Sequence, residues 1–313
     1  MKAVVQRRYG SAVLGELDVP VPGKGEVLLE VRSAGVDMGT WHLFAGRPYL
    51  VRAVGLRGPG TPVPGRDVAG VVTALGPGVT EFAVGDEVFG TCGSGAFAEY
   101  TVARVSRLAR KPGNVSFAEA AAVPISGGTA LQGLRGVQPG QRVLVLGAGG
   151  GVGSYGVQIA KALGAHVTGV CSTGKVGLVR SLGADEVVDY TVADYTGTYD
   201  VVLDCGGGRS LATLRRAATP KGRIVMVGAE TGGKLTGGVE RTLVALALNL
   251  FVSQKYVPLL ATERADVFEE LRVLIEAGRV KPPVEREFPL SEGVAAIEHV
   301  HSRRSLGKVV VTV

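Results

Sequence analysis

The spacing of hydrophobic residues divides this 313-residue chain into two main regions. From residue 1 to about 112, short apolar runs alternate with polar positions. Turns rich in proline and glycine separate these runs, as at 20–26, 58–65 and 76–79. Alternation of this kind places every second side chain on one face of a strand. The pattern therefore predicts an irregular all-β domain.

From about residue 116 to 255, apolar strands and helices follow one another in turn. The predicted strands lack polar alternation, which is typical of a parallel sheet covered on both faces. They lie at 143–147, 166–170, 186–190, 199–205 and 223–228. This order predicts a doubly wound parallel sheet. After it, the pattern predicts a helix near 264–278, a strand near 284–288, a helix near 291–301 and a last strand at 308–313.

The first of these strands passes directly into a glycine-rich turn. The apolar residues 143–146 are followed by a segment with the spacing Ala-x-Gly-x-x-Gly, and then by the pattern of a helix. Such a turn lets the backbone approach a pyrophosphate, which then lies against the N–H groups at the helix N-terminus. The candidate cofactor-binding residues in it are Ala148, Gly150, Gly151, Val152 and Gly153.

The end of the second strand indicates which dinucleotide binds. NAD enzymes usually place Asp or Glu there, which accepts a hydrogen bond from the ribose 2′-hydroxyl. This chain has Cys-Ser-Thr-Gly-Lys at 171–175, with no carboxylate and with Lys175 close by. We therefore expect NADPH, because its 2′-phosphate gains from a fixed cation. The alternative is that Lys175 and Arg180 only form the solvated face of the next helix, and for Arg180 we prefer this interpretation.

A set of motifs occurs in a specific order along the whole chain. They are KAVVQRRYG at 2–10, PGRDVAGVVTALG at 64–76, AAAVPISGGTALQGL at 120–134, YDVVLDCGG at 199–207 and LGKVVVTV at 306–313. Each motif is common by itself, whereas their order is not. In this order they resemble the zinc-independent quinone oxidoreductase branch of the medium-chain dehydrogenases/reductases, the branch that includes zeta-crystallin.

This resemblance implies an α/β fold with two domains. A GroES-like, β-rich catalytic domain would cover residues 1–115 and be completed by residues 281–313. A doubly wound Rossmann domain that binds NADPH would cover residues 116–280. In the family the substrate cleft lies between these two domains.

The resemblance also implies individual cofactor contacts. The residues that contact the 2′-phosphate in the family correspond here to Ser172, Lys175, Tyr190 and Arg303. Thr129 resembles a threonine on the ribose side of the nicotinamide, and the alternative is that it only begins a helix.

Related zinc alcohol dehydrogenases carry metal ligands that this sequence lacks. Where those proteins have Gly-His-Glu, this chain has Gly65-Arg66-Asp67, and Asp37 takes the place of the first ligand cysteine. A catalytic zinc needs three Cys, His or carboxylate ligands, and a guanidinium at a ligand position would repel the ion. We therefore expect no metal. A metal shared by Asp37 and His42 is the weaker alternative.

Without a metal, the chemistry rests on the nicotinamide and on the residues that orient the substrate. Hydride would pass to a quinone or to the β-carbon of an α,β-unsaturated carbonyl, and the developing oxyanion needs a hydrogen-bond donor. The candidate catalytic residues are Asp37, His42 and Tyr49. The family usually has asparagine at the Asp37 position, so a carboxylate there puts quinone reduction in doubt. Alternatively, Asp37 only caps the following turn, and His42 and Tyr49 only line the wall of the substrate pocket. The long loop 47–64 could form another wall of that pocket.

Three classes of function follow from these observations. The first is an NADPH-dependent reductase of quinones or α,β-unsaturated carbonyls. The second is a metal-free alcohol/carbonyl reductase or a biosynthetic tailoring reductase. The third is an NADPH-binding sensor or RNA-binding protein with low turnover. The net charge of +6 is mild and the basic residues are mixed with acidic ones, so a nucleic-acid partner is not expected.

The apolar run from Leu243 to Val252 is about half as long as a membrane span. It predicts a buried element or a subunit contact, and we expect a homodimer joined through it. The cysteines at 92, 171 and 205 show no paired spacing, and no secretory leader is apparent. These features favour a reducing cytoplasm and no membrane association.

Overall fold

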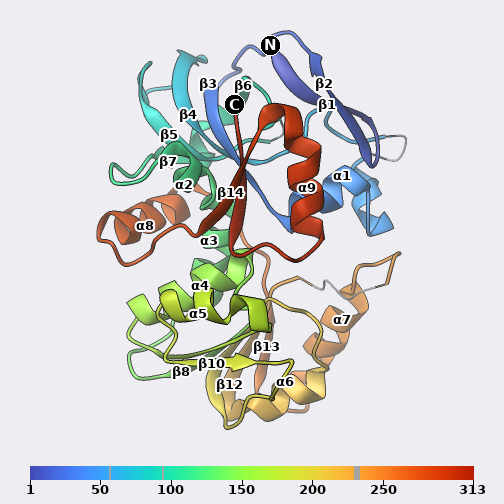
Figure 1. Cartoon of the computed structure of the whole chain (residues 1–313), viewed down its shortest axis with the longest axis vertical. Coiled ribbons are helices and arrows are strands. Elements are labelled where there is room, and N and C mark those ends of the chain that lie inside the picture. The colour runs from blue at the N-terminus through green and yellow to red at the C-terminus, as the bar shows by residue number, and fades with distance from the viewer. Residues whose placement is uncertain (56–57, 94, 229–232) are drawn as a thin grey trace. The chain divides into compact units, whose positions relative to one another are not determined.

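The computed structural model describes residues 1–55, 58–93, 95–228 and 233–313 (Figure 1). These residues form two compact units. The first unit consists of residues 1–128, 263–278 and 282–313, and the second consists of residues 129–262 and 279–281. The first unit therefore includes 116–128 and 263–278, two segments that the sequence places in the Rossmann domain.

The first unit is built mainly on antiparallel strands, as the alternating pattern predicts. A two-stranded sheet pairs β1 (Lys2–Arg8) with β2 (Ser11–Glu16). A seven-stranded sheet has the order β14-β15-β3-β4-β5-β7, and β6 pairs with β3. Its strands are β3 (Glu26–Val36), β4 (Asp67–Leu75), β5 (Glu87–Thr91), β6 (Tyr100–Arg104), β7 (Leu108–Arg110), β14 (Val284–Pro289) and β15 (Lys308–Thr312).

Two helices explain why the first unit extends beyond its expected boundaries. α2 (Phe117–Ala121) starts with a capping box between Ser116 and Glu119 and packs on β3 and β4. α8 (Ala265–Glu276) buries Phe268 and Leu271 and packs on β7. The other helices of this unit are α1 (Met38–Ala45) and α9 (Gly293–His301), with 3-10 helices η1 (Tyr49–Val54), η2 (Val105–Arg107) and η4 (Leu290–Glu292).

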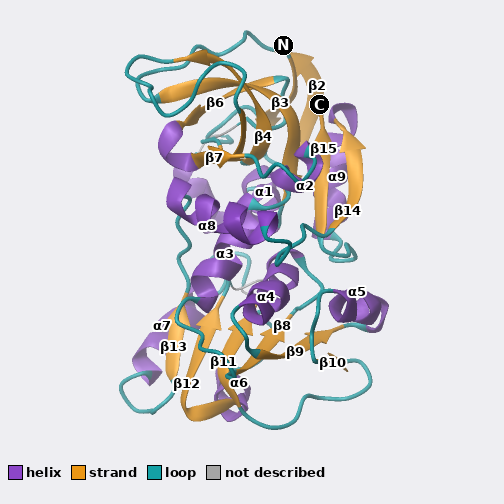
Figure 2. Ribbon diagram, turned by 90° about the vertical axis from the view of Figure 1, so that its left-hand side faces the viewer, coloured by secondary structure: helices purple, strands orange, loops and turns teal. Residues whose placement is uncertain are grey.

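The second unit contains a six-stranded parallel sheet, whose strands are spread across the lower part of Figure 2. Its order is β10-β9-β8-β11-β12-β13, so β8 and β11 lie at the centre. The strands are β8 (Arg142–Leu146), β9 (His166–Cys171), β10 (Glu186–Asp189), β11 (Tyr199–Asp204), β12 (Ala218–Met226) and β13 (Lys255–Pro258). The helices are α4 (Gly151–Ala162), η3 (Thr173–Lys175), α5 (Val176–Ser181), α6 (Leu211–Ala217) and α7 (Val239–Leu248). α3 (Pro124–Leu134) starts in the first unit and ends in the second.

The doubly wound sheet and the β-rich unit confirm the predicted fold class. The sixth parallel strand, β13, is absent from the sequence-based prediction. The apolar run 243–252 falls on α7 and the turn after it, and it is not a buried element. Leu243 is 62% exposed and Phe251 is 83% exposed. Within the described part of the chain, none of the helices combines the length and apolar character that crossing a membrane requires.

Candidate functional site

The glycine-rich turn joins the end of β8 to the start of α4. Gly147 adopts φ +78, and its N–H and that of Ala148 both donate to the carbonyl oxygen of Val170 at 3.0 Å. These bonds fix the turn to the neighbouring strand β9. Gly150 is the N-cap of α4, so the turn ends at the helix N-terminus. The structure thus places this turn where a parallel sheet binds a pyrophosphate.

Close approach of α4 to this turn explains the glycine at 153. A Cβ at Gly153 would lie 2.1 Å from the carbonyl oxygen of Gly147 and 2.8 Å from the Cα of Ala148. Both are backbone atoms, which cannot move aside as a flexible side chain would. Ala148 is fully buried beneath the turn, whereas Gly151 and Val152 are partly exposed at the first positions of α4. The last glycine of the motif therefore permits the contact between helix and turn.

Three predicted phosphate-binding residues lie near one another at the carboxyl edge of the sheet. Ser172 follows β9 directly, and Lys175 ends the short helix η3. A Cβ at Gly149 would meet the Cβ of Lys175 at 2.7 Å, so the lysine side chain packs on the glycine turn. Tyr190 follows β10, and its N–H donates to the carbonyl of Cys171 at 3.0 Å. Lys175 thus contacts the glycine turn, and Tyr190 is hydrogen-bonded to the end of β9.

A carboxylate outside the predicted set of residues lies at the same edge. Asp189, the last residue of β10, accepts hydrogen bonds from Thr191 through its N–H (3.0 Å) and its hydroxyl (2.7 Å). The Thr191 hydroxyl lies 2.9 Å from that of Thr173. Hydrogen bonds from Thr173 and Thr191 hold the pKa of Asp189 below its usual range. The carboxylate that binds the ribose in NAD enzymes usually follows the second strand, whereas Asp189 ends the neighbouring strand β10, so the usual sequence signal does not include it.

The remaining cofactor candidates are divided between the two units. Thr129 lies in α3, at the start of the second unit. Arg303 lies in the first unit, in the turn after α9, and its N–H donates to Val300 at 3.1 Å. Its φ of 61 makes it the one non-glycine residue with positive φ in the described chain, a conformation that is common at functional turns. A role for either residue in cofactor binding stays a prediction.

Asp37 caps α1 with one of its two carboxylate oxygens. Its Oδ1 accepts hydrogen bonds from the N–H (2.7 Å) and the hydroxyl (3.2 Å) of Thr40. Its Oδ2 is buried and has no hydrogen-bond partner in the described part of the chain. The capping alternative is therefore correct for Oδ1. A buried carboxylate oxygen without a partner is costly, so Oδ2 is the atom through which Asp37 would meet a ligand.

His42 and Tyr49 each have structural contacts of their own. The Nδ1 of His42 lies 2.7 Å from the carbonyl oxygen of Arg47, and it must donate because a carbonyl only accepts. Tyr49 is 44% exposed, and the Arg52 guanidinium lies 4.9 Å from the centre of its ring. These contacts order the loop after α1. A catalytic role for either residue stays a prediction.

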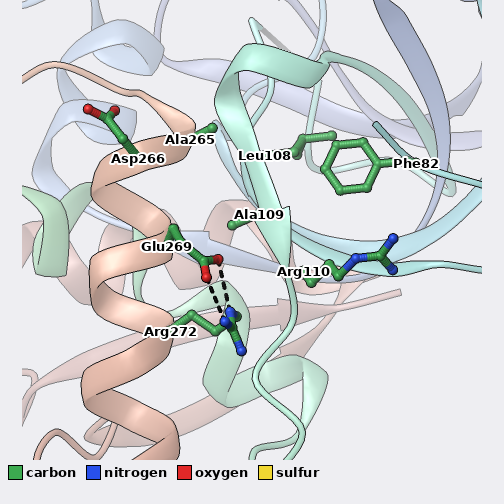
Figure 3. Close-up of a pocket in the computed structure, with 8 residues that line it drawn as sticks. All are labelled: Phe82, Leu108, Ala109, Arg110, Ala265, Asp266, Glu269 and Arg272. Carbon is green, nitrogen blue, oxygen red and sulfur yellow. Dashed lines mark hydrogen bonds and ion pairs between the residues drawn. The ribbon is translucent and has the colours of Figure 1, made fainter. Parts of the chain in front are cut away.

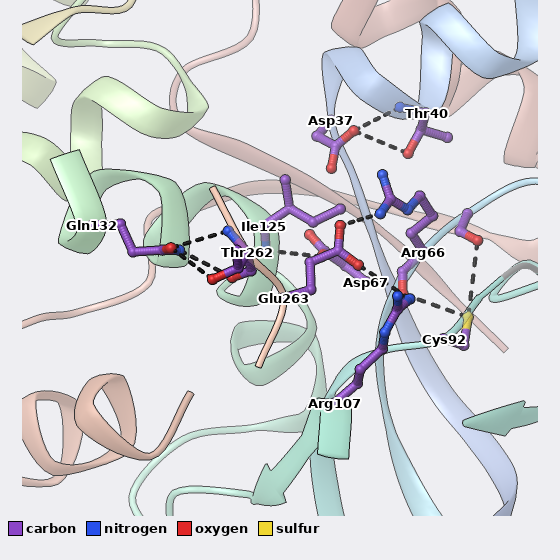
Figure 4. Close-up of polar contacts among 11 residues, drawn as sticks. Asp37, Thr40, Arg66, Asp67, Cys92, Arg107, Ile125, Gln132, Thr262 and Glu263 are labelled. Carbon is purple, nitrogen blue, oxygen red and sulfur yellow. Dashed lines mark hydrogen bonds and ion pairs between the residues drawn. The ribbon is translucent and has the colours of Figure 1, made fainter. Parts of the chain in front are cut away.

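Figure 4 shows a charged cluster in the first unit, formed by Arg66, Glu263 and Arg107. The guanidinium of Arg66 hydrogen-bonds to Oε1 of Glu263. Nη1 of Arg107 lies 3.6 Å from Oε2 of the same carboxylate. Two cations therefore share one anion. Glu263 is far from both arginines in sequence, so no local signal could have identified it.

A buried ion pair next to this cluster connects four elements, β15, β4, β3 and α3. Lys308, at the start of β15, is 1% exposed and donates to the carbonyl of Val36 (3.0 Å) and the hydroxyl of Ser126 (3.1 Å). Its Nζ lies 3.7 Å from Oδ2 of Asp67, and Oδ1 of Asp67 accepts from the N–H of Ile125 at 2.9 Å. Burial raises the pKa of Asp67 to about 7, even though Lys308 opposes the shift.

The positions that correspond to metal ligands of zinc alcohol dehydrogenases hold other interactions here. Arg66 binds Glu263, and Asp37 caps α1. Within residues 1–55, 58–93, 95–228 and 233–313, no three His, Cys, Asp or Glu side chains are arranged so that they could hold a metal ion. The residues at these positions therefore do not fit a zinc site of the usual kind.

Figure 3 shows an open pocket of ≈ 530 Å³ between α8 and the segment around β7. It contains none of the predicted site residues. Its cations are already paired, since Arg110 lies 2.8 Å from Asp86 and Arg272 binds both Glu269 and Glu276. This pocket is therefore a poor candidate for a binding site of anionic ligands.

Comparison with known proteins identifies the family. Residues 23–113 match the family described as alcohol dehydrogenase GroES-like domain, and residues 182–311 match the one described as zinc-binding dehydrogenase. The chloroplast envelope quinone oxidoreductase homolog of Arabidopsis thaliana is 31% identical, over 99% of this chain and 98% of its own. The NADPH-dependent alkenal/one oxidoreductase of the same plant is 33% identical, over 99% of this chain and 79% of its own.

A solved structure agrees with these relatives. The quinone oxidoreductase from Coxiella burnetii superposes with a TM-score of 0.88 at 26% identity, covering 100% of this chain and 99% of its own. Full-length similarity in sequence and in fold, together with the two matched domains, leads to one assignment. This chain belongs to the medium-chain dehydrogenase/reductase superfamily of NAD(P)H-dependent oxidoreductases, and within it to the quinone oxidoreductase branch.

Proposed function

We propose that this chain uses NADPH to reduce a quinone or an α,β-unsaturated carbonyl, without a metal ion. The observation that carries the cofactor assignment is the position of Lys175. Its side chain packs on Gly149 of the pyrophosphate-binding turn, and β9 ends without a carboxylate. A cation at this place would pair with a 2′-phosphate. Ser172 and Tyr190, at the ends of β9 and β10, would complete that contact.

The names of two relatives support the substrate class. One is called a quinone oxidoreductase homolog and the other an NADPH-dependent alkenal/one oxidoreductase. In both kinds of substrate the electron pair delivered with the hydride leaves negative charge on a carbonyl-derived oxygen. The side chains of Asp37, His42 and Tyr49 would then orient the acceptor and supply hydrogen bonds to it.

A panel of acceptors tests the proposal. Quinones, enones, ketones and alcohols are assayed by cofactor absorbance, with NADPH and with NADH, before and after exhaustive chelation. We expect turnover of quinones or enones with NADPH, unchanged by the chelator. Turnover of ketones or alcohols alone would instead identify a carbonyl reductase. Loss of activity on chelation, restored by zinc, would contradict the metal-free proposal.

Replacing Lys175 should separate the two cofactors. We expect Lys175→Ala to weaken NADPH binding by about 10- to 150-fold, since a charge-assisted hydrogen bond contributes about 1.5–3 kcal/mol. NADH has no 2′-phosphate, so its affinity should hardly change. Fluorescence titration of both cofactors measures the effect. Arg180 is an exposed cation in α5, the helix that follows Lys175. Arg180→Ala is therefore the control, and it should bind both cofactors as the wild type does. Equal affinities of the wild type for NADPH and NADH would contradict the cofactor assignment.

Removing the charge of Asp37 should favour quinone reduction. Asp37→Asn keeps an oxygen that can cap α1, but it removes a carboxylate that would repel the anionic product. If the carboxylate stands about 8–12 Å from the developing oxyanion, its charge contributes about 1.4–2 kcal/mol at an effective dielectric constant of about 20, so its removal should increase kcat about 10- to 30-fold. Asp18→Asn, an exposed change in the same unit, is the control. If Asp37→Asn, His42→Ala and Tyr49→Phe all leave kcat unchanged, these residues are structural only.

The apolar surface of the second unit supports a homodimer. Leu243, Leu250 and Phe251 are 62%, 81% and 83% exposed, and β13 is the edge strand of the parallel sheet. An apolar surface beside an open strand edge tends to pair with a second copy. We expect light scattering at micromolar concentration to give a dimeric mass. Leu243→Glu should yield the monomer, whereas Val192→Glu, an exposed change after the opposite edge strand β10, should not. A monomeric wild type would contradict the proposal.

A further inference from the structure

The charged cluster of Arg66, Glu263 and Arg107 contains two cations and one anion and is half-buried. The side chain of Arg66 is 31% exposed and that of Glu263 is 19% exposed. Glu263 holds Arg66 from one side and Arg107 from the other, through different carboxylate oxygens. The Arg66 guanidinium is therefore fixed in position rather than mobile in solvent. A fixed cation that remains partly accessible is suited to binding an anionic oxygen.

The sheet register places Arg66 next to Asp37. β3 and β4 are antiparallel, and Gly35 pairs with Asp67. Asp37 comes just after the end of β3, and Arg66 comes just before the start of β4. Because the two strands are antiparallel neighbours, both residues lie at the same end of this strand pair. Figure 4 shows the two side chains in one group with Glu263. Arg66 thus belongs to the same surface as the candidate that the sequence places beside the substrate.

We infer that Arg66 binds the carbonyl oxygen of the electrophile and stabilises the negative charge that develops there, with Glu263 as its positioning residue. This inference rests on the proposed function. The dinucleotide, when bound, supplies the hydride that forms a C–H bond at the β-carbon of an enone. The electron pair of the C=C bond moves toward oxygen and gives an enolate. Arg66 donates to that oxygen, and water supplies the proton that the α-carbon takes up.

The donor inventory favours Arg66 over its neighbours for this role. A guanidinium has five N–H donors and stays charged at all working pH values. The bond to Glu263 uses one of them. The Nδ1 donor of His42 is occupied by the Arg47 carbonyl, and Tyr49 packs on Arg52. Arg107 is more exposed, at 40%, and stands 3.6 Å from Glu263, so it is held less firmly.

Variants of the cluster test this inference with the wild-type acceptor found in the panel. We expect Arg66→Ala to lower kcat by about 10²- to 10³-fold, the usual effect of losing one donor to an oxyanion, with NADPH affinity unchanged. Arg66→Lys should retain part of the rate. Glu263→Gln should lower kcat less than Arg66→Ala does, because the guanidinium remains. Arg104→Ala, an exposed arginine of the same unit that is paired with Glu26 at 3.8 Å, should behave like the wild type.

Chemical rescue separates catalysis from a structural role. Guanidinium chloride at millimolar concentration should restore turnover to Arg66→Ala and should not stimulate the wild type or Tyr49→Phe. If Arg66→Ala lost activity only because its structure changed, a free guanidinium ion would not restore turnover. Full activity of Arg66→Ala, or a folded but inactive Arg66→Ala that no guanidinium rescues, would overturn the inference while leaving the proposed function intact. A wild type that reduces no quinone or enone with NADPH would overturn both.

Discussion

Gly153→Ala should lower the affinity for NADPH by about 10²- to 10⁴-fold. The new Cβ would lie 2.1 Å from the carbonyl oxygen of Gly147 and 2.7 Å from its carbonyl carbon, so α4 must move away from the turn. A pyrophosphate would then lose charge-assisted hydrogen bonds to the N–H groups at the helix N-terminus. Two lost bonds of about 1.5–3 kcal/mol each give this range.

A series of glycine-to-alanine variants would show whether the loss of NADPH affinity depends on the space around the added Cβ. A Cβ at Gly150 would meet the Gly147 oxygen at 3.3 Å, which requires only a small adjustment. At Gly177, in α5, nothing lies within 4 Å of the added atom. We therefore expect affinity to fall in the order Gly177→Ala, Gly150→Ala, Gly153→Ala. Fluorescence titration measures it, and circular dichroism confirms that each variant is folded. Unchanged affinity of a folded Gly153→Ala would show that the turn does not bind the cofactor.

The local parts of this site could be predicted from the sequence because each depends on neighbours in the chain. An apolar strand, a glycine turn and a helix are consecutive in the chain, and the structure places Gly150 at the N-cap of α4. Lys175 could be placed for the same reason, since it follows β9 by a few residues. β13 is hard to predict because it has only four residues, Lys255–Pro258, and ends in a proline, which is unfavourable within a strand. Its pairing with β12 alone defines it as a strand.

The charged groups of the first unit could not be placed in this way. Arg66 and Glu263 are 197 positions apart, and Lys308 meets Ser126 across 182 positions. Such contacts follow from the folding of the whole unit and not from a local pattern. Lys308 opens an otherwise apolar strand, where a lysine side chain usually reaches solvent. In the structure it is 1% exposed.

At a pH above about 7, where Asp67 of the wild type is mainly ionised, Lys308→Met should destabilise the first unit by about 3–5 kcal/mol, the usual cost of leaving one member of a buried ion pair alone. Asp67 has 0% exposure, and its Oδ2 has Lys308 as its ionic partner at 3.7 Å. The substitution also removes the hydrogen bonds that Nζ gives to Val36 and Ser126. Urea unfolding followed by the fluorescence of Trp41 measures the effect, because this single tryptophan lies in the first unit.

The protonation of Asp67 makes the free energy of unfolding depend on pH. Burial raises the pKa of Asp67 from 3.8 to about 7 in the folded protein, so the folded state holds its proton more tightly than the unfolded state. Asp67 therefore lowers the free energy of unfolding as the pH rises from about 4 to 7, and its contribution is constant above 7. Lys308 lowers this pKa. Without it, the decline should continue above pH 7.

Two further variants decide whether the ion pair is responsible. Lys24→Met, an exposed change before β3, should shift the free energy of unfolding by less than about 0.5 kcal/mol. The double variant Asp67→Asn with Lys308→Met removes both charges, so it should recover part of the stability that Lys308→Met loses and should show no decline above pH 7. If Lys308→Met unfolds at the same urea concentration as Lys24→Met, the buried pair contributes nothing. A double variant as unstable as the sum of the two single ones would place the cost in lost packing and not in the unpaired carboxylate.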